Sequence, residues 1–206
     1  MARFVRSLES VGLGDVALVG GKNAALGELT RCLDGAEVST PRGFAVTAEA
    51  YQAIVDLNGL RGPLAAAMSA VGDDVGVLAT KALECRRMLQ QAAWPDGLAA
   101  EIRKTITVLE EAGHDIAFAV RSSATAEDLP QASFAGQHDS FLNIRGVDDV
   151  LDACRRCYAS VFTDRAVRYR TDHGFDHLDV ALSSGIVEMV RADLGASGVA
   201  FTLDTE

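Results

Sequence analysis

An arginine and several hydroxyl groups follow a short apolar run in the middle of the chain. The run at 117–120 predicts a buried strand, and Arg121 with the serines at 122–123 stands at its end. A guanidinium keeps its charge and matches the geometry of a phosphate group, and hydroxyls supply further hydrogen bonds. This pattern indicates an anion site that suits phosphate. The residues also allow a second interpretation, a surface loop in which Arg121 pairs with Glu127 or Asp128.

A segment of small residues extends this anion site along the chain. It covers Ser133–Gln137, reads SFAGQ, and precedes an alternating strand expected at 140–144. Small residues such as Gly136 let backbone N–H groups approach an anion closely. We therefore expect this segment to contact the same ligand as Arg121.

A second cation stands near the N-terminus. Gly20-Gly21-Lys22 opens a helix that is expected to run to about Cys32. The N-terminus of a helix offers unpaired N–H groups and a partial positive charge, and Lys22 adds a mobile cation there. The spacing does not match a Walker-type P-loop. A solvated surface lysine is the alternative that these residues leave open.

The elements around these residues mix short strands with helices. Thr47 is expected to cap a helix at 48–58, and Thr163 with Asp164 a helix at 165–172. Residues 59–113 are helical without a motif, and the periodicity predicts an antiparallel helix pair at 75–91 and 98–112. The remaining expected elements are a helix at 147–160 and strands at 180–191 and 197–203. Because β-α-β alternation is absent, the predicted class is α+β, with a mixed or antiparallel sheet backed by helices.

Composition narrows the functional class. The chain has 206 residues, of which 49% are hydrophobic and 23% charged, and its formal net charge is −10. These values are typical of a globular domain and argue against a general nucleic-acid binder. No apolar stretch is long enough to span a membrane, and no secretory signal follows the N-terminal arginines. We expect no nucleic-acid or membrane partner.

The cysteines and one group of arginines are assigned structural roles. Cys154 and Cys157 form a C-x-x-C in a helical context without a second ligand pair, so we predict that both are unpaired and metal-free. The lack of a disulfide framework favours a reducing cytoplasm. Three arginines are expected on a solvated or inter-subdomain face: Arg165, Arg168 and Arg170.

The segments AVRSSATAEDLPQASFAGQ and GGKNAALGE resemble the ATP-binding domain of the phosphoenolpyruvate synthase family. Pyruvate phosphate dikinase and the rifamycin phosphotransferases are relatives of that family. The resemblance extends over nearly the whole chain and is densest at 18–51 and 117–206. It implies an ATP-grasp fold in which 1–206 is the N-terminal subdomain, with a helical insertion at about 59–113.

The resemblance also implies a reaction. In this family ATP, pyruvate and water give phosphoenolpyruvate, AMP and phosphate, a step of gluconeogenesis, through a phosphorylated histidine on a mobile domain. We expect the chain to end before the second ATP-grasp half, the phosphohistidine domain and the barrel, and to be inactive alone. Two alternatives are a rifamycin phosphotransferase-like domain and a non-catalytic nucleotide-binding or assembly module.

The resemblance assigns roles to single residues. It implies catalytic contacts of Lys22 and Arg121 with the ATP phosphates. Further nucleotide contacts are expected from Ser133, Gly136, Gln137 and Thr202. Magnesium is an expected cofactor, with ligands beyond this chain and none within it. ATP and pyruvate are the expected small-molecule partners, and a homo-oligomer is compatible with the sequence.

Overall fold

The computed structural model describes most of the chain. It covers residues 4–33, 35, 37–111, 116–125, 128–129, 132–133 and 139–199, with backbone only at 128–129 and 132–133. Within these residues, no helix combines the length and the apolar character needed to cross a membrane.

The centre of the fold is a five-stranded antiparallel sheet. Its strands follow the spatial order β1-β2-β7-β3-β6, and every pairing is antiparallel. A separate two-stranded ladder consists of β4 (Asp128–Leu129) and β5 (Ala132–Ser133). The predicted α+β class is therefore confirmed. The strands of the large sheet are β1 (Val5–Ser7), β2 (Gly43–Val46), β3 (Phe118–Ala124), β6 (Ser140–Ile144) and β7 (Leu182–Glu188).

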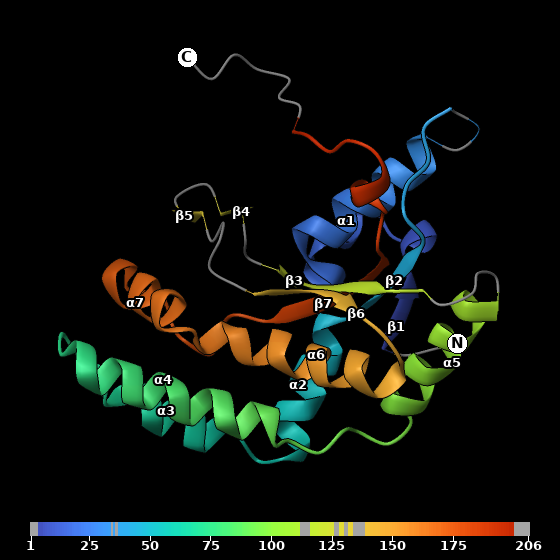
Figure 1. Cartoon of the computed structure of the whole chain (residues 1–206). Helices are drawn as coiled ribbons and strands as arrows, with labels where there is room; N and C mark the ends of the chain where they lie inside the picture. The colour runs from blue at the N-terminus through green and yellow to red at the C-terminus, as the bar shows by residue number, and fades with distance from the viewer. Residues whose placement is uncertain are drawn as a thin grey trace, which may run out of the picture.

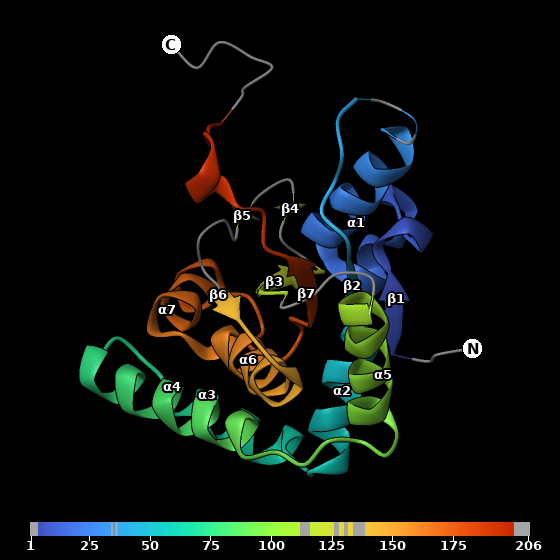
Figure 2. The same ribbon diagram turned by 45° about the vertical axis from the view of Figure 1, so that its right-hand side comes forward.

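Helices cover the two faces of the sheet unequally (Figures 1 and 2). Helix α1 lies on one face together with the short helices η1 and η2, and most of the other helices pack beneath the opposite face. The α-helices are α1 (Val16–Cys32), α2 (Ala48–Leu57), α3 (Arg61–Ser69), α4 (Val75–Gln90), α5 (Leu98–Glu111), α6 (Val147–Ala159) and α7 (Asp164–His173). The 3₁₀ helices are η1 (Leu8–Ser10), η2 (Leu13–Asp15), η3 (Ser160–Phe162) and η4 (Ala192–Leu194).

Strand alternation separates the two faces. Phe118 and Val120 of β3 point into the large core with the helices, as does Ile186 of β7. Successive strand residues point to opposite faces, so Arg121 and Ser123 lie on the face of α1. The smaller apolar cluster on that face joins α1 to β2 and β7 through Val19, Ala24, Ala45 and Val187, with Leu8 and Val11.

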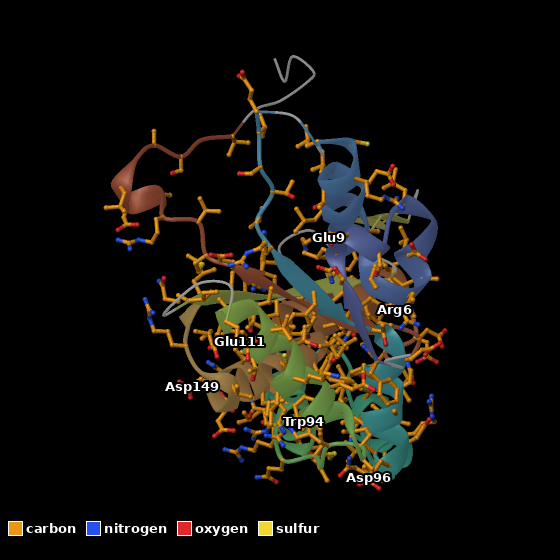
Figure 3. The ribbon with its side chains drawn as sticks, turned by 90° about the vertical axis from the view of Figure 1, so that its right-hand side faces the viewer. Arg6, Glu9, Trp94, Asp96, Glu111 and Asp149 are labelled. Atoms are coloured by element: carbon orange, nitrogen blue, oxygen red, sulfur yellow. The ribbon has the colours of Figure 1, made fainter. Side chains whose placement is uncertain are left out.

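The expected pairing of the helices at 75–91 and 98–112 is wrong. Helix α4 packs against α3, α6 and α7, whereas α5 packs mainly against α6 and the strands β1 and β2. The linker around Trp94 separates them, at the end of the molecule opposite to α1 (Figure 3). Because Ala92 and Leu98 are both buried at the two ends of this linker, the chain crosses beneath the sheet instead of turning back along α4.

Two further predictions need correction. Arg170 is fully buried, whereas the sequence placed it with Arg165 and Arg168 on a solvated or inter-subdomain face. Its guanidinium donates to Val161 O at 2.6 Å and lies over the ring of Phe162, so one turn of α7 points it into the core. The strand expected at 197–203 is absent at 197–199, and the remainder lies outside the described residues.

Candidate functional site

Helix α1 is interrupted at Gly20, and the segment that bears Lys22 begins immediately after it. Gly20 has φ 74° and ψ 164°, a conformation that side chains with a Cβ rarely adopt. A Cβ at this position would also overlap with the backbone carbonyl of Ser123 in β3. The two glycines recognised in the sequence therefore start a helical segment and let it touch the sheet, although regular helix already begins at Val16.

The first turn after Gly20 is held against the sheet by hydrogen bonds. The backbone N–H of Asn23 donates to Ser123 Oγ at 3.2 Å, so a strand residue takes the role that a capping side chain usually has. Lys22, one residue earlier, is exposed. This helix start combines a cation with the partial positive charge of the helix, which favours an anionic ligand.

Arg121 lies within strand β3 and not at its end. The strand continues to Ala124, because residues 122–124 pair with β7 in the antiparallel register, and both serines are buried. Ser122 Oγ donates to Asp139 O at 3.0 Å. The predicted end of the strand at Arg121 is therefore wrong, and the guanidinium projects from the middle of a sheet face.

The structure brings Lys22 and Arg121 to the same side of the sheet. Arg121 is opposite Gly185 and Ser123 is opposite Ser183 in the antiparallel register of β3 and β7. Both pairs face α1, and both cations are exposed. The β4–β5 ladder, which contains Ser133, also lies on this side (Figure 1).

Several predicted ligand residues lie outside the described part of the chain. These are Gly136, Gln137 and Thr202, and for Ser133 only the backbone is described. The alternative in which Arg121 pairs with Glu127 or Asp128 concerns side chains that are also outside it.

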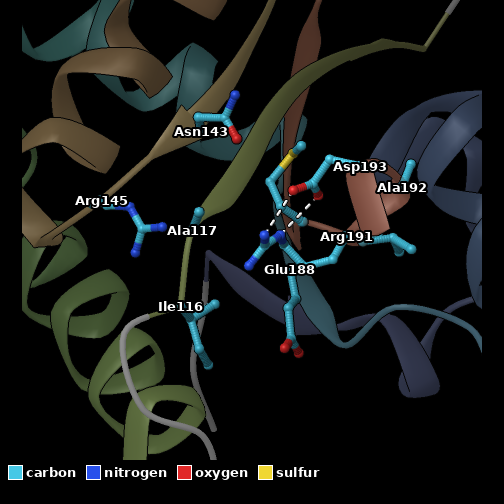
Figure 4. Close-up of a pocket in the computed structure, with 10 residues that line it drawn as sticks. Ile116, Ala117, Asn143, Arg145, Glu188, Arg191, Ala192 and Asp193 are labelled. Atoms are coloured by element: carbon cyan, nitrogen blue, oxygen red, sulfur yellow. Dashed lines mark hydrogen bonds and ion pairs between the residues drawn. The ribbon is translucent and has the colours of Figure 1, made fainter. Parts of the chain in front are cut away.

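A cavity that sequence reasoning missed lies where β3 begins and β7 ends (Figure 4). Its volume is about 550 Å³. Charged groups line it: Arg191 forms a two-point ion pair with Asp193 at 2.7 and 2.8 Å, and Arg145 faces the same space. The sequence pattern did not indicate this cavity, since the residues after Glu188 were expected to continue the strand to 191. The lining residues are Ile116, Ala117, Asn143, Arg145, Glu188, Met189, Val190, Arg191, Ala192 and Asp193.

The cavity and Arg121 are arranged along one strand. Ala117, which lines the cavity, is four positions before Arg121, so the two are separated by roughly 13 Å at the rise of an extended chain. The Glu188 carboxylate in the cavity wall is fixed by Arg42 of the turn before β2 at 3.0 Å. An elongated ligand can therefore occupy the cavity at one end and reach Arg121 with the other.

The cysteine pair is buried away from this site. Cys154 and Cys157 of α6 are free and lie in the large core. Burial raises the pKa of the Cys157 thiol to about 12 and that of Cys154 well above its ordinary value. Such thiols stay protonated and are poor nucleophiles. Within the described ranges, no group of three or more His, Cys, Asp or Glu residues could hold a metal ion.

Comparison with known proteins gives the family. Residues 16–206 match the model of the pyruvate phosphate dikinase, AMP/ATP-binding domain. A phosphoenolpyruvate synthase of Pseudomonas aeruginosa is 51% identical over 100% of this chain, and one of Neisseria meningitidis is 49% identical over 98%. The Escherichia coli phosphoenolpyruvate synthase is 45% identical over 95% of the chain.

The chain therefore belongs to the family of the pyruvate phosphate dikinase AMP/ATP-binding domain. It spans only about a quarter of the length of these curated relatives, namely 26%, 26% and 25%.

Proposed function

We propose that ATP binds across the α1 face of the sheet. In this proposal the nucleoside occupies the cavity beside Ala117 and Arg191, and the triphosphate extends along β3 toward Arg121 and Lys22. The observation that supports it is the common face of the two cations, with the cavity at one end of the same strand. The expected contacts of Ser133, Gly136, Gln137 and Thr202 are part of the same proposal.

The two cations have a defined chemical task at such a site. Negative charge on the phosphoryl oxygens must be neutralised and fixed in position before a phosphoryl group is transferred. Arg121 offers a planar, permanently charged group that can bind two oxygens at once, and Lys22 offers a mobile point charge at a helix start. Together they are suited to bind and orient the phosphate chain.

We further propose that the protein to which this domain belongs is a phosphoenolpyruvate synthase. The names of the relatives support this assignment over a rifamycin phosphotransferase-like or non-catalytic module. Such an enzyme converts ATP, pyruvate and water to phosphoenolpyruvate, AMP and phosphate through a phosphorylated histidine. The chain would then be one half of an ATP-grasp site, whose second half closes over the nucleotide.

Magnesium is the expected companion of ATP in this reaction, but the described residues do not fit it. No cluster of carboxylates or imidazoles large enough for a metal site is found among them. We therefore assign no metal ligand to the described part of the chain. The roles of Lys22 and Arg121 are derived from their own charge and position.

Nucleotide titration of four variants tests the proposal. Lys22→Ala and Arg121→Ala should each weaken ATP binding by roughly 10- to 100-fold, because a hydrogen bond to a charged group contributes about 1.5–3 kcal/mol. The matched controls are Lys81→Ala on α4 and Arg103→Ala on α5, which lie on other elements and form surface ion pairs with Glu84 and Asp148. Calorimetry should show unchanged ATP affinity for both controls. Equal affinity of all four variants would refute the site.

The identity of the final phosphoryl acceptor is tested in the complete protein. With ATP and pyruvate it should form phosphoenolpyruvate, and Arg121→Ala should abolish most phosphorylation of its histidine. Normal labelling of the histidine in that variant would show that Arg121 has only a structural role. Product formation from rifamycin instead of pyruvate would overturn the synthase assignment.

A further inference from the structure

We propose that Asn23 is a positioning residue that sets the placement of Lys22 relative to Arg121. The inference rests on the proposed function, because it concerns the same phosphate-binding face. It is drawn from the contacts of one buried residue, whose backbone N–H and side-chain amide join the start of the helix to two strands. Asn23 is only 4% exposed, and so does not itself present its side chain to a ligand in solvent.

The backbone and side-chain N–H groups of Asn23 donate to the helix and to the sheet. Its Nδ2 donates to Val19 O at 3.0 Å, across the interruption at Gly20, and to Ser183 Oγ in β7 at 3.0 Å. Its backbone N–H donates to Ser123 Oγ in β3. The Ser183 hydroxyl in turn donates to Val46 O of β2 at 2.8 Å. Asn23 thus connects α1 directly with β3 and β7 and, through Ser183, with β2.

The position of the Asn23 amide is coupled to that of Arg121. Its Oδ1 lies so close to Gly185 that a Cβ on this glycine would overlap with it. Gly185 is the residue directly opposite Arg121 in the β3–β7 register. Lys22 precedes Asn23 in the chain, so the buried amide lies between the anchor points of the two cations. A shift of Asn23 therefore changes the separation of Lys22 and Arg121.

The burial of these polar groups explains why the position of the helix start after Gly20 is well defined. Asn23, Ser123 and Ser183 are all buried, and a buried polar group that loses its partner is costly. Any rotation of the helix start would break several of these bonds together. The arrangement consequently holds the helix start in one place before a ligand arrives, which reduces the cost of ordering the site on binding.

Substitutions in the full chain separate positioning from general stability. Asn23→Ala should lower the affinity for ATP and for inorganic tripolyphosphate about 10-fold, since at least two hydrogen bonds are lost. Ser183→Ala removes one of them and should lower both affinities about 3-fold. Adenosine, which has no phosphate, should bind equally to all variants. Leu8→Ala is the control, because Leu8 packs in the same small apolar cluster and its backbone carbonyl faces Gly27, one turn beyond the helix start.

The double variant gives a second, independent criterion. Because Asn23 and Ser183 share one hydrogen bond, Asn23→Ala with Ser183→Ala should be less harmful than the product of the single effects. Leu8→Ala should lower the melting temperature without changing the ratio of tripolyphosphate to adenosine affinity. Unchanged ATP affinity in Asn23→Ala and Ser183→Ala would refute the positioning role and leave the proposed function standing. Absence of ATP binding by the wild-type chain would refute the proposed function and the positioning role with it.

Discussion

Two glycines on facing elements determine how closely α1 approaches the sheet. Gly20 in the helix meets the backbone of Ser123, and Gly185 in β7 meets the side chain of Asn23. Each contact excludes a Cβ, and Gly20 in addition has a positive φ. These two close contacts matter because Lys22 lies on α1 and Arg121 lies on the sheet, the two parts that meet here.

Gly20→Ala should destabilise the chain by about 2–4 kcal/mol, since backbone strain and overlap with Ser123 act together. Gly59→Ala is the matched control, because Gly59 also has a positive φ but has open space around it. We expect about 1 kcal/mol for the control. Chemical denaturation of both variants measures the difference, and equal losses would show that the helix–strand contact contributes nothing.

A second feature at the residue scale is the contact between the buried Arg170 and the half-buried His177. Arg170 Nε donates to His177 Nδ1 at 3.2 Å, which requires a neutral imidazole with an unprotonated Nδ1. Burial, followed by the charge of Arg170, lowers the pKa of His177 to about 4, and the carboxylate of Asp176 opposes the shift. A positive charge on this ring would face a buried guanidinium.

The pair predicts a loss of stability in mild acid. The pKa of His177 is about 4 in the folded chain and about 6.5 in an unfolded one, so between these values the unfolded chain binds a proton that the folded chain excludes. The stabilisation that the neutral His177 adds to the free energy of unfolding is complete above about pH 6.5, and it is lost as the pH falls toward 4. Solvent screening of the half-buried ring limits it to on the order of 1–2 kcal/mol.

His177→Asn keeps a hydrogen-bond acceptor for Arg170 but cannot titrate in this range. The difference in the free energy of unfolding between wild type and variant should therefore change between pH 6.5 and 4, with the wild type losing more. If the free energies of unfolding of the two proteins changed in parallel with pH, the protonation of His177 would not be coupled to folding.

At the element scale, two threonines with the same sequence signal behave differently. Both Thr47 and Thr163 occupy the N-cap position of a helix, as predicted. Thr163 Oγ1 accepts the N–H of Ala166 at 3.2 Å. The hydroxyl of Thr47 is buried, and no partner for it is found within the described residues. The N-cap position can be recognised from the sequence. Whether the threonine hydroxyl forms the capping hydrogen bond depends on its rotamer, which packing determines.

Thr163→Val should therefore cost about 1 kcal/mol by removing a cap. Thr47→Val should leave the free energy of unfolding within about 0.5 kcal/mol of wild type or raise it, because no hydrogen bond is lost. Thermal and urea unfolding of the two variants test this pair. A larger loss for Thr47→Val would mean that its hydroxyl has a partner in solution.

The elements also show what the sequence could and could not predict. Local patterns were sufficient for β6, for helix α6 and for the Thr163 cap of α7. Local patterns failed where contacts between segments far apart in the sequence determine the structure. The burial of Arg170 depends on η3, and the partners of α4 and α5 depend on the path of the linker between them. The cavity beside Glu188 was missed because it forms only when three strand ends meet.

At the scale of the whole molecule, the two sheet faces have different tasks. One face is covered by a large apolar core with most of the helices, which provides the main source of stability. Among the described residues, the other face is covered in part by α1 and a small cluster, and Arg121 is exposed there. With a net charge of −10, the chain attracts a polyanion only locally, through cations such as Lys22 and Arg121. ATP affinity should accordingly fall as the salt concentration rises.

The central claim is that ATP lies on the α1 face of the sheet. Amide NMR spectra of the ¹⁵N-labelled chain during an ATP titration test it most directly. We predict the largest shift changes at Gly21, Lys22 and Arg121 and at residues 189–193, with α3 and α4 unaffected. Changes confined to the helical layer on the opposite face, or none at saturating ATP, would contradict the account.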